Sequence, residues 1–271
     1  MKLTEMRAWL DQRGIQLTKS LGQNFLHDAH QLQRIAEAGA LTKADKVLEI
    51  GPGLGPLTEL LLAQAGEVLA IEVDARLVAV LRERFSQLNL VHADALEFIK
   101  RERRDWSDWK LVANLPYSVA SPILVELALS PQRPKQMTVT LQLEVAQRLM
   151  AKADDDDYGV LTLLVQLDYE PRGWFKIPAG CFFPAPDVDS ACVNLVRRAN
   201  PLLTDEQRPR FVRIVKKAFS QRRKMMLKLL KAEWPAEKLT QAFTELNISP
   251  LERAEKLSLE QFVGLTNLLT R

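Results

Sequence analysis

Glu49-Ile50-Gly51-Pro52-Gly53-Leu54-Gly55-Pro56-Leu57-Thr58 is the stretch that decides the fold of this 271-residue chain. It follows an apolar run and precedes leucines at helical spacing, so it predicts a strand, a glycine turn and a helix. The three glycines lack the Cβ atoms that would keep a ligand away from the backbone, and the second proline suits the first turn of a helix. We therefore expect a cofactor to lie across this turn.

The spacing of the glycines narrows the class of cofactor. The dinucleotide fingerprint G-x-G-x-x-G requires a third glycine where this chain has Pro56, which disfavours a nicotinamide cofactor. Glu72 ends the next apolar segment about 20 residues beyond the glycines, where an acid can accept hydrogen bonds from ribose hydroxyls. A tight turn without a ligand is the alternative, and Glu72 disfavours it. Because every nucleoside has a ribose, Glu72 does not choose among nucleoside cofactors.

The composition is that of an ordinary globular protein, with 47% hydrophobic and 26% charged residues. The length allows one large core and a smaller module. Cys181 and Cys192 lack C-x-x-C spacing, and His27, His30 and His92 lack ligand spacing, so neither a disulfide framework nor a metal site is predicted. The N-terminus does not resemble a signal peptide and no long apolar run occurs, so we expect a cytoplasmic protein without a membrane partner.

Positive charge is concentrated in one part of the chain. The net charge is +3, but residues 197–231 contain twelve Lys or Arg and two acids, which leaves an excess of acids elsewhere. Such asymmetry predicts a polyanionic partner. A solvated helix face is the simpler alternative for a basic run viewed alone.

Predicted strands and helices alternate along the first 200 residues. After a short helix over 2–13 and an irregular loop over 18–26, Asp28 can cap a helix that ends at Gly39. Beyond the strand of the glycine turn, further strands are predicted over 68–73, 88–92, 110–113, 137–143, 168–177 and 190–197, and Asp74 and Asp94 can cap the helices after the first two. This alternation predicts a parallel sheet with helices on both faces, ending in an antiparallel pair.

The pattern changes near Pro201. Beyond it the sequence shows no strand signal and predicts helices over 202–220, 225–231, 237–246 and 258–269. We therefore predict an α/β domain over 1–200, which includes an N-terminal helix and loop over 1–27, and a small all-helical domain over 201–271.

Polar or glycine residues follow four of the predicted parallel strands. In doubly wound sheets, ligands bind outside the carboxyl ends of the strands, and Gly51, Glu72, Asp94 and Asn114 all occupy such ends. We expect these four positions to define one cleft. Asp94 can accept a hydrogen bond from an adenine amino group, cap the following helix, or do both.

Asn114-Leu115-Pro116-Tyr117 is the most specific motif of the chain. An exocyclic amine conjugated to a purine ring is a poor nucleophile, and two well-placed acceptors can free its lone pair. The Asn114 side-chain oxygen and the Leu115 carbonyl can hold the two N–H groups, while Pro116 stiffens the turn and Tyr117 offers a ring on which a flipped base stacks. The predicted reaction is direct displacement at the methyl group of a sulfonium cofactor, and an ordinary proline turn is the alternative.

With these motifs the chain resembles the ribosomal RNA adenine dimethyltransferases that use S-adenosylmethionine, in particular their bacterial small-subunit branch associated with kasugamycin sensitivity. The resemblance is carried, in the family's order, by Gly22-Gln23-Asn24-Phe25-Leu26, Glu49 to Gly55, Glu72-Val73-Asp74, Asp94-Ala95, Asn114 to Tyr117, Gln142 to Arg148, Phe183-Pro184-Ala185-Pro186-Asp187-Val188-Asp189-Ser190 and Phe219 to Lys224. It implies a Rossmann-like methyltransferase sheet with a small C-terminal all-helical domain.

The resemblance also implies roles for individual residues. Those implied to contact S-adenosylmethionine are Asn24, Leu26, Gly51, Glu72, Asp94 and Asn114. Residues 114–117 would present the target adenine, with Tyr117 and Phe183 at the base pocket, and we expect Arg222, Arg223 and Lys224 to bind RNA. Family members place two methyl groups on each of two adjacent adenosines in a hairpin near the 3′ end of 16S rRNA. The implied partner is that RNA in the immature small subunit, and we expect a monomer without a metal.

Other functions remain open from the sequence. The nearest is a large-subunit rRNA adenine methyltransferase of the macrolide-resistance type, which would share the pocket. A non-catalytic RNA-binding or transcription factor is disfavoured by the intact tetrapeptide at 114–117, and a nicotinamide dehydrogenase by Pro56. Ser118 departs from the asparagine of many relatives. The basic segment 100–109 is interpreted as a solvated helix end rather than an RNA contact, and the sequence assigns no purpose to the acidic loop 154–157.

Overall fold

The chain folds into two compact units in a computed structural model that describes residues 1–17 and 22–270. The first unit comprises Met1–Ala146 and Pro171–Arg197, and the second comprises Gln147–Glu170 and Arg198–Arg271. Each unit has its own buried apolar residues. The two are therefore described separately.

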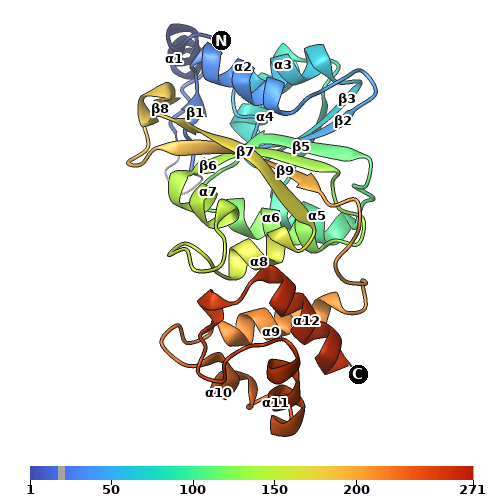
Figure 1. Cartoon of the computed structure of the whole chain (residues 1–271). Coiled ribbons are helices and arrows are strands. Elements are labelled where there is room, and N and C mark those ends of the chain that lie inside the picture. The colour runs from blue at the N-terminus through green and yellow to red at the C-terminus, as the bar shows by residue number, and fades with distance from the viewer. Residues whose placement is uncertain (18–21, 271) are drawn as a thin grey trace. The chain divides into compact units, whose positions relative to one another are not determined.

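A seven-stranded sheet forms the centre of the first unit (Figure 1). Its strands are β2 (Lys46–Ile50), β3 (Glu67–Glu72), β4 (Asn89–His92), β5 (Trp109–Asn114), β6 (Gln136–Gln142), β7 (Tyr169–Ile177) and β9 (Ser190–Arg197). Their order is β4-β3-β2-β5-β6-β9-β7, and the first five run parallel while β9 runs antiparallel to β6. Chain order reverses between β2 and β5, which is where doubly wound sheets bind ligands.

Helices cover both faces of this sheet, as the sequence predicts. Figure 1 shows α2 and α3 on one face and α5 and α6 on the other. The helices of this part of the chain are α1 (Leu3–Gln12), α2 (Ala29–Ala38), α3 (Pro56–Gln64), α4 (Ala75–Arg84), α5 (Ala95–Glu102), α6 (Ala120–Leu129) and α7 (Leu143–Met150). Asp28, Asp74 and Asp94 cap α2, α4 and α5 through side-chain oxygens that accept backbone N–H groups. The three predicted caps are confirmed.

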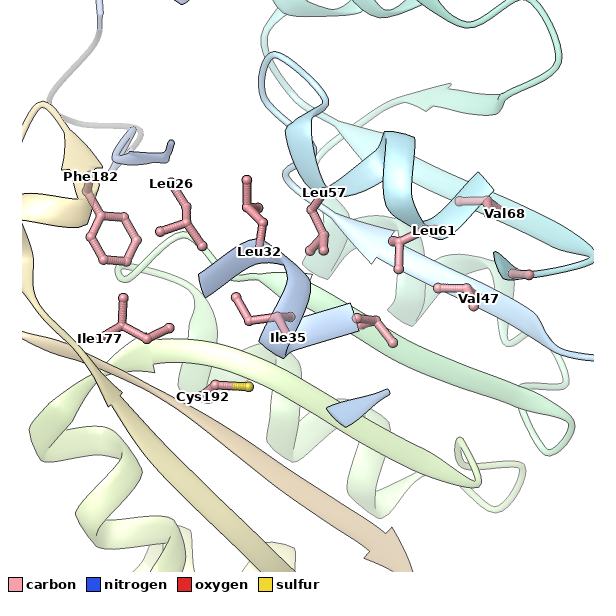
Figure 2. Close-up of a cluster of buried hydrophobic side chains, with 12 residues drawn as sticks. Leu26, Leu32, Ile35, Val47, Leu57, Leu61, Val68, Ile177, Phe182 and Cys192 are labelled. Atoms are coloured by element: carbon pink, nitrogen blue, oxygen red, sulfur yellow. The ribbon is translucent and has the colours of Figure 1, made fainter. Parts of the chain in front are cut away.

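A cluster of buried apolar side chains fixes α2 and α3 on the sheet (Figure 2). Leu32 and Ile35 project from α2, and Leu57 and Leu61 from α3, toward residues such as Val47 of β2. Fully burying one leucine or isoleucine side chain stabilises the fold by about 1.5–3 kcal/mol. The apolar residues at helical spacing thus hold α3 against the sheet. The glycine turn that precedes α3 is therefore held at the carboxyl end of β2.

The segment before α2 differs from the predicted irregular loop. β1 (Phe25–Leu26) pairs antiparallel with β8 (Phe182–Phe183), so the expectation of a loop is wrong at these two residues. A two-residue strand is too short to produce an alternating pattern in the sequence. Residues 18–21 of the predicted loop lie outside the described residues. The pairing joins the N-terminal segment to the proline-containing segment before β9.

The second unit is mainly helical. It contains α8 (Val160–Gln166), α9 (Arg208–Ala218), α10 (Met226–Leu230), α11 (Ala236–Glu245) and α12 (Leu259–Thr270). The helix predicted over 202–220 begins at Arg208, with Pro209 in its first turn. The buried Arg208 guanidinium pairs with the buried carboxylate of Asp168 and also with Asp205, which fixes the start of α9 against the chain before β7.

Candidate functional site

A pocket lies in the first unit at the carboxyl ends of four parallel strands. It is lined by residues that follow or end β2, β3, β4 and β5, together with residues 22–25 from the N-terminal segment. The predicted site residues that line it are Asn24, Gly51, Glu72, Asp94, Asn114, Leu115, Pro116 and Tyr117. The structure thus brings together positions that are up to 93 residues apart in the sequence.

The glycine turn has a left-handed backbone that side chains would strain. Gly51 and Gly53 have φ angles of 67° and 62°. A Cβ atom on Gly53 would lie 2.7 Å from the Phe25 ring, and one on Gly51 would lie 3.1 Å from Pro116. The turn therefore approaches both the N-terminal segment and the tetrapeptide more closely than any other residue type permits. Gly51 is held in place by its N–H, which donates to the Ile71 carbonyl at 2.9 Å.

Glu72 joins the glycine turn to the end of β3. Its Oε2 accepts the Gly53 N–H at 3.1 Å, and its Oε1 accepts the N–H groups of Val73 and Asp74 at 2.9 and 3.0 Å. The side chain is 5% exposed, and burial raises the pKa of its carboxyl, against the opposing effect of these hydrogen bonds. A carboxylate has about four acceptor positions, so three backbone contacts leave roughly one for a ligand hydroxyl.

Asp94 lies at the pocket and serves as a helix cap at the same time. Its Oδ1 accepts the N–H of Glu97 at 3.0 Å. The cap uses one carboxylate oxygen, so Oδ2 can accept a hydrogen bond from a ligand. Asp94 can therefore cap α5 and accept a hydrogen bond from an adenine amino group at the same time.

Asn114 has a fixed amide and a buried oxygen without a partner. Its Nδ2 donates to the backbone carbonyl of Asn24 at 3.2 Å, and this contact determines which end of the amide is the acceptor. Its Oδ1 has no hydrogen-bond partner among the described residues. Leaving such an acceptor unsatisfied costs about 1–3 kcal/mol. A buried acceptor of this kind is rare in folded proteins and indicates a donor supplied by a ligand.

The rest of the tetrapeptide is held by backbone contacts. The Leu115 N–H donates to the Thr140 carbonyl at 3.0 Å, and the Val119 N–H donates to the Pro116 carbonyl at 3.1 Å. Tyr117 is partly buried, and burial raises the pKa of its phenol. Its hydroxyl lies 2.5 Å from the hydroxyl of Ser190. The tetrapeptide is therefore a rigid turn at the pocket wall.

Some predicted site residues lie outside the pocket lining. Leu26 is 2% exposed and packs in the apolar cluster of Figure 2. Phe183 packs beside α1, with the Arg7 guanidinium 4.8 Å from its ring centroid. Arg222, Arg223 and Lys224 are exposed residues of the second unit. The roles predicted for these five residues stay predictions.

Sequence reasoning missed several residues that line the pocket. Gln23 is one, and its Nε2 donates to Asp74 Oδ2 at 3.0 Å. Hydrogen bonds from Arg76 are the main cause that lowers the pKa of Asp74 to about 2. Phe25, Leu96 and Val119 also line the pocket. Gln23 and Phe25 belong to a quoted motif, but their spacing along the chain carries no signal of a contact with residues 51–74.

Two further properties concern metals and membranes. Within residues 1–17 and 22–270, His, Cys, Asp and Glu side chains form no group of three or more that could hold a metal ion. Over the same residues, every helix is too short or too polar to cross a membrane.

Residues 14–271 match the family described as "Ribosomal RNA adenine dimethylase". The chain belongs to this family. It is 37% identical over 276 residues to the ribosomal RNA small subunit methyltransferase A of Geobacillus sp. (strain WCH70), a match that covers 97% of this chain and 95% of the relative. The protein of the same name from Streptococcus pneumoniae (strain P1031) is also 37% identical, with the same coverage.

Solved structures resemble most of the chain as well. A dimethyladenosine transferase from Plasmodium falciparum has a TM-score of 0.76 and 25% identity, covering 89% of this chain and 95% of the other. The 23S rRNA methyltransferase ErmE has a TM-score of 0.70 and 30% identity, covering 92% of this chain and all of the other. The expected Rossmann-like fold with a helical part is confirmed. The family member described here is an S-adenosylmethionine-dependent rRNA adenine dimethyltransferase, as the resemblance implied.

Proposed function

We propose that this enzyme transfers methyl groups from S-adenosylmethionine to the exocyclic amines of two adjacent adenosines in a hairpin near the 3′ end of 16S rRNA, giving N6,N6-dimethyladenosines. The single observation that carries the proposal is the buried Asn114 Oδ1, an acceptor without a partner beside the Leu115 backbone in the pocket. The names of the relatives, ribosomal RNA small subunit methyltransferase A, support the small subunit as the source of the substrate.

The residues of the pocket fit the cofactor. The glycine turn lines the pocket at Gly51 and Gly53, and Glu72 retains an acceptor position for a ribose hydroxyl. Asp94 Oδ2 can accept from the adenine amino group, and Asn24, Leu26 and Asn114 complete the proposed contacts. When bound, S-adenosylmethionine supplies a methyl group activated by a sulfonium centre.

The tetrapeptide prepares the target amine. Asn114 Oδ1 and the Leu115 carbonyl each accept one N–H, so the nitrogen lone pair no longer conjugates fully with the purine and is directed away from both acceptors. Tyr117 stacks against the flipped base, and Phe183 borders the base pocket. The contact between Asn114 Nδ2 and the Asn24 carbonyl keeps the oxygen, rather than the amino group, facing the target.

The helical part of the chain provides the proposed RNA contacts. Arg222, Arg223 and Lys224 are exposed, as phosphate contacts require, in the most basic part of the sequence. We propose that residues 1–200 form a catalytic domain and that residues 201–271 form an RNA-binding domain. We further propose that the enzyme acts in the cytoplasm, as a monomer and without a metal, on the immature small subunit.

Mass spectrometry of the RNA product tests the function. The enzyme is incubated with S-adenosylmethionine and either immature small subunits or naked large-subunit RNA, and the RNA is then analysed both as nucleosides and as nuclease fragments that retain the sequence. We expect dimethyladenosine at two adjacent positions of 16S rRNA and none in 23S rRNA. The resemblance to ErmE makes large-subunit RNA the alternative substrate, and dimethylation of 23S rRNA alone would overturn the proposal.

A further inference from the structure

A hydrogen bond between two hydroxyl groups joins Tyr117, which lines the pocket, to Ser190 of β9. Tyr117 Oη lies 2.5 Å from Ser190 Oγ, and one of the two hydroxyls donates to the other. Ser190 is fully buried and is the first residue of β9, where it pairs with Gln142 of β6. Buried polar groups are normally hydrogen-bonded, and in this pair each hydroxyl gives the other its partner.

The geometry of a tyrosine side chain explains what this hydrogen bond does. The Cβ, Cγ and Oη atoms lie on one line, so holding Oη fixes the direction of the ring axis. The side chain has two rotatable torsions, and the hydrogen bond restrains the first of them, χ1. Rotation of the ring about its own axis is then the only large freedom left to Tyr117. The ring, whichever way its face turns about this axis, is therefore kept at one place on the pocket wall.

Ser190 is itself firmly anchored. The carbonyl of the preceding residue, Asp189, accepts the Leu143 N–H at 3.0 Å, and Asp189 Oδ1 accepts the Ala179 N–H at 2.9 Å. At the other end of the same segment, β8 pairs with β1. The Ser190 hydroxyl therefore has a fixed position, and its hydrogen bond holds the hydroxyl end of the Tyr117 side chain.

We propose that Ser190 is a positioning residue for methyl transfer, whose hydroxyl holds the Tyr117 ring in the place where the flipped target base stacks. The proposal rests on the function proposed above, in which Tyr117 stacks on that base. Ser190 acts through Tyr117. Without its hydroxyl the ring can turn about χ1, and the stacked state of the base becomes less populated.

A fluorescent base measures this directly. Small subunits are reconstituted with 2-aminopurine at one target adenosine, because its fluorescence rises when the base leaves the helix and falls again when it stacks on an aromatic ring. 2-Aminopurine lacks the 6-amino group, so its signal reports flipping and stacking rather than the hydrogen bonds to residues 114 and 115. With S190A we expect a brighter complex than with the native enzyme, and with S190T, which retains the hydroxyl, a signal near the native one.

Turnover on native small subunits completes the test. The loss of one neutral hydrogen bond corresponds to roughly a five-fold fall in kcat. KM for the subunit should change little, because the target base flips and stacks on Tyr117 only after the RNA has docked. Y117F keeps the ring but removes the same bond, so it should resemble S190A, and the double variant should be no slower than either. T138V is the matched control, because Thr138 of β6 is fully buried, its hydroxyl accepts a hydrogen bond from Gln136 Nε2, and it does not line the pocket.

The possible outcomes separate the two proposals. Equal 2-aminopurine signals for the native enzyme and S190A, failure of S190T to restore the signal, or additive losses in the double variant would each overturn the role of Ser190. A native enzyme that produces neither a 2-aminopurine response nor dimethyladenosine would overturn the proposed function as well. If S190A does not fold, Y117F alone decides, because it leaves β9 unchanged.

Discussion

The pocket of the first unit and the basic surface of the second use polar side chains in opposite ways. In the pocket, single contacts orient the buried polar groups: Glu72 accepts three backbone N–H groups, and Asn114 donates to one carbonyl while its oxygen stays available for a ligand. In the second unit, the cations at 222–224 are exposed. Chemistry in the pocket depends on the position of single atoms, whereas binding at the surface depends on summed charge. A single substitution in the pocket should therefore have a large effect on activity, whereas substitutions on the basic surface should each have a small effect on binding, and these effects should add up.

The sharpest effect is expected at Asn114. N114A removes the acceptor for the target amine, and by analogy with the removal of one transition-state hydrogen bond, kcat should fall by about 100- to 1,000-fold. Binding of S-adenosylmethionine, measured by calorimetry, should be largely retained, because Gly51, Glu72 and Asp94 remain. Turnover of N114A within a few-fold of the native enzyme would show that the amide is not the acceptor.

The next largest effect is expected at Glu72. Hydrogen bonds to a charged group contribute about 1.5–3 kcal/mol, so E72A should weaken cofactor binding by roughly 10- to 150-fold in calorimetry. The loss also frees the N–H of Gly53, which loosens the glycine turn. E67Q is the matched control, since Glu67 begins the same strand at the opposite end. An equal loss in E67Q and E72A would assign the effect to general destabilisation.

Local signals account for what the sequence predicts correctly. The glycine turn, the caps at Asp28, Asp74 and Asp94 and the strand ends are encoded within a few neighbouring residues, and the structure contains each of them. Helix α6 is missed because apolar residues occur on all sides of it, so its sequence shows no helical period, although its buried residues do.

Contacts between distant segments account for what the sequence does not predict. The hydrogen bond from Asn114 to Asn24 spans 90 residues, and the one between Tyr117 and Ser190 spans 73. Neither contact produces a pattern in a single sequence, because each forms only when the fold brings two distant segments together. The motifs thus indicate which residues belong to the site, and only the fold indicates which of them orient one another.

A graded effect is expected at the basic surface. If Arg222, Arg223 and Lys224 contact phosphates, replacing all three by alanine should weaken RNA binding roughly ten-fold. The slope of log affinity against log salt concentration should fall by about 2–3, since each contact contributes about 0.7–0.9. The matched control removes three exposed cations, Lys100, Arg101 and Arg103, at the end of α5. An unchanged slope in the first variant, or an equal change in the control, would contradict a specific role for residues 222–224.

The smallest effect on methylation is expected at Glu49, which lies in β2 just before the glycine turn and does not line the pocket. Its carboxyl is 1% exposed, and Thr58 Oγ1 donates to its Oε2 at 2.7 Å. Burial raises the pKa of Glu49 from 4.5 to about 8, so the folded state holds a proton that the unfolded chain releases at neutral pH. The stabilisation due to this proton is complete below pH 4.5 and is lost as pH rises to about 8.

E49Q should remove this pH dependence, because glutamine stays neutral throughout. The free energy of unfolding of the native enzyme, measured by urea denaturation, should fall relative to that of E49Q by about 1.4 kcal/mol per pH unit between pH 5 and 8. Above the folded pKa the difference should stop growing, since both states are then ionised. Parallel curves for the two proteins would mean that Glu49 is ionised in the folded state. A buried charge at Glu49 would then lie close to Glu72, and the expected loss of stability with rising pH would need another cause.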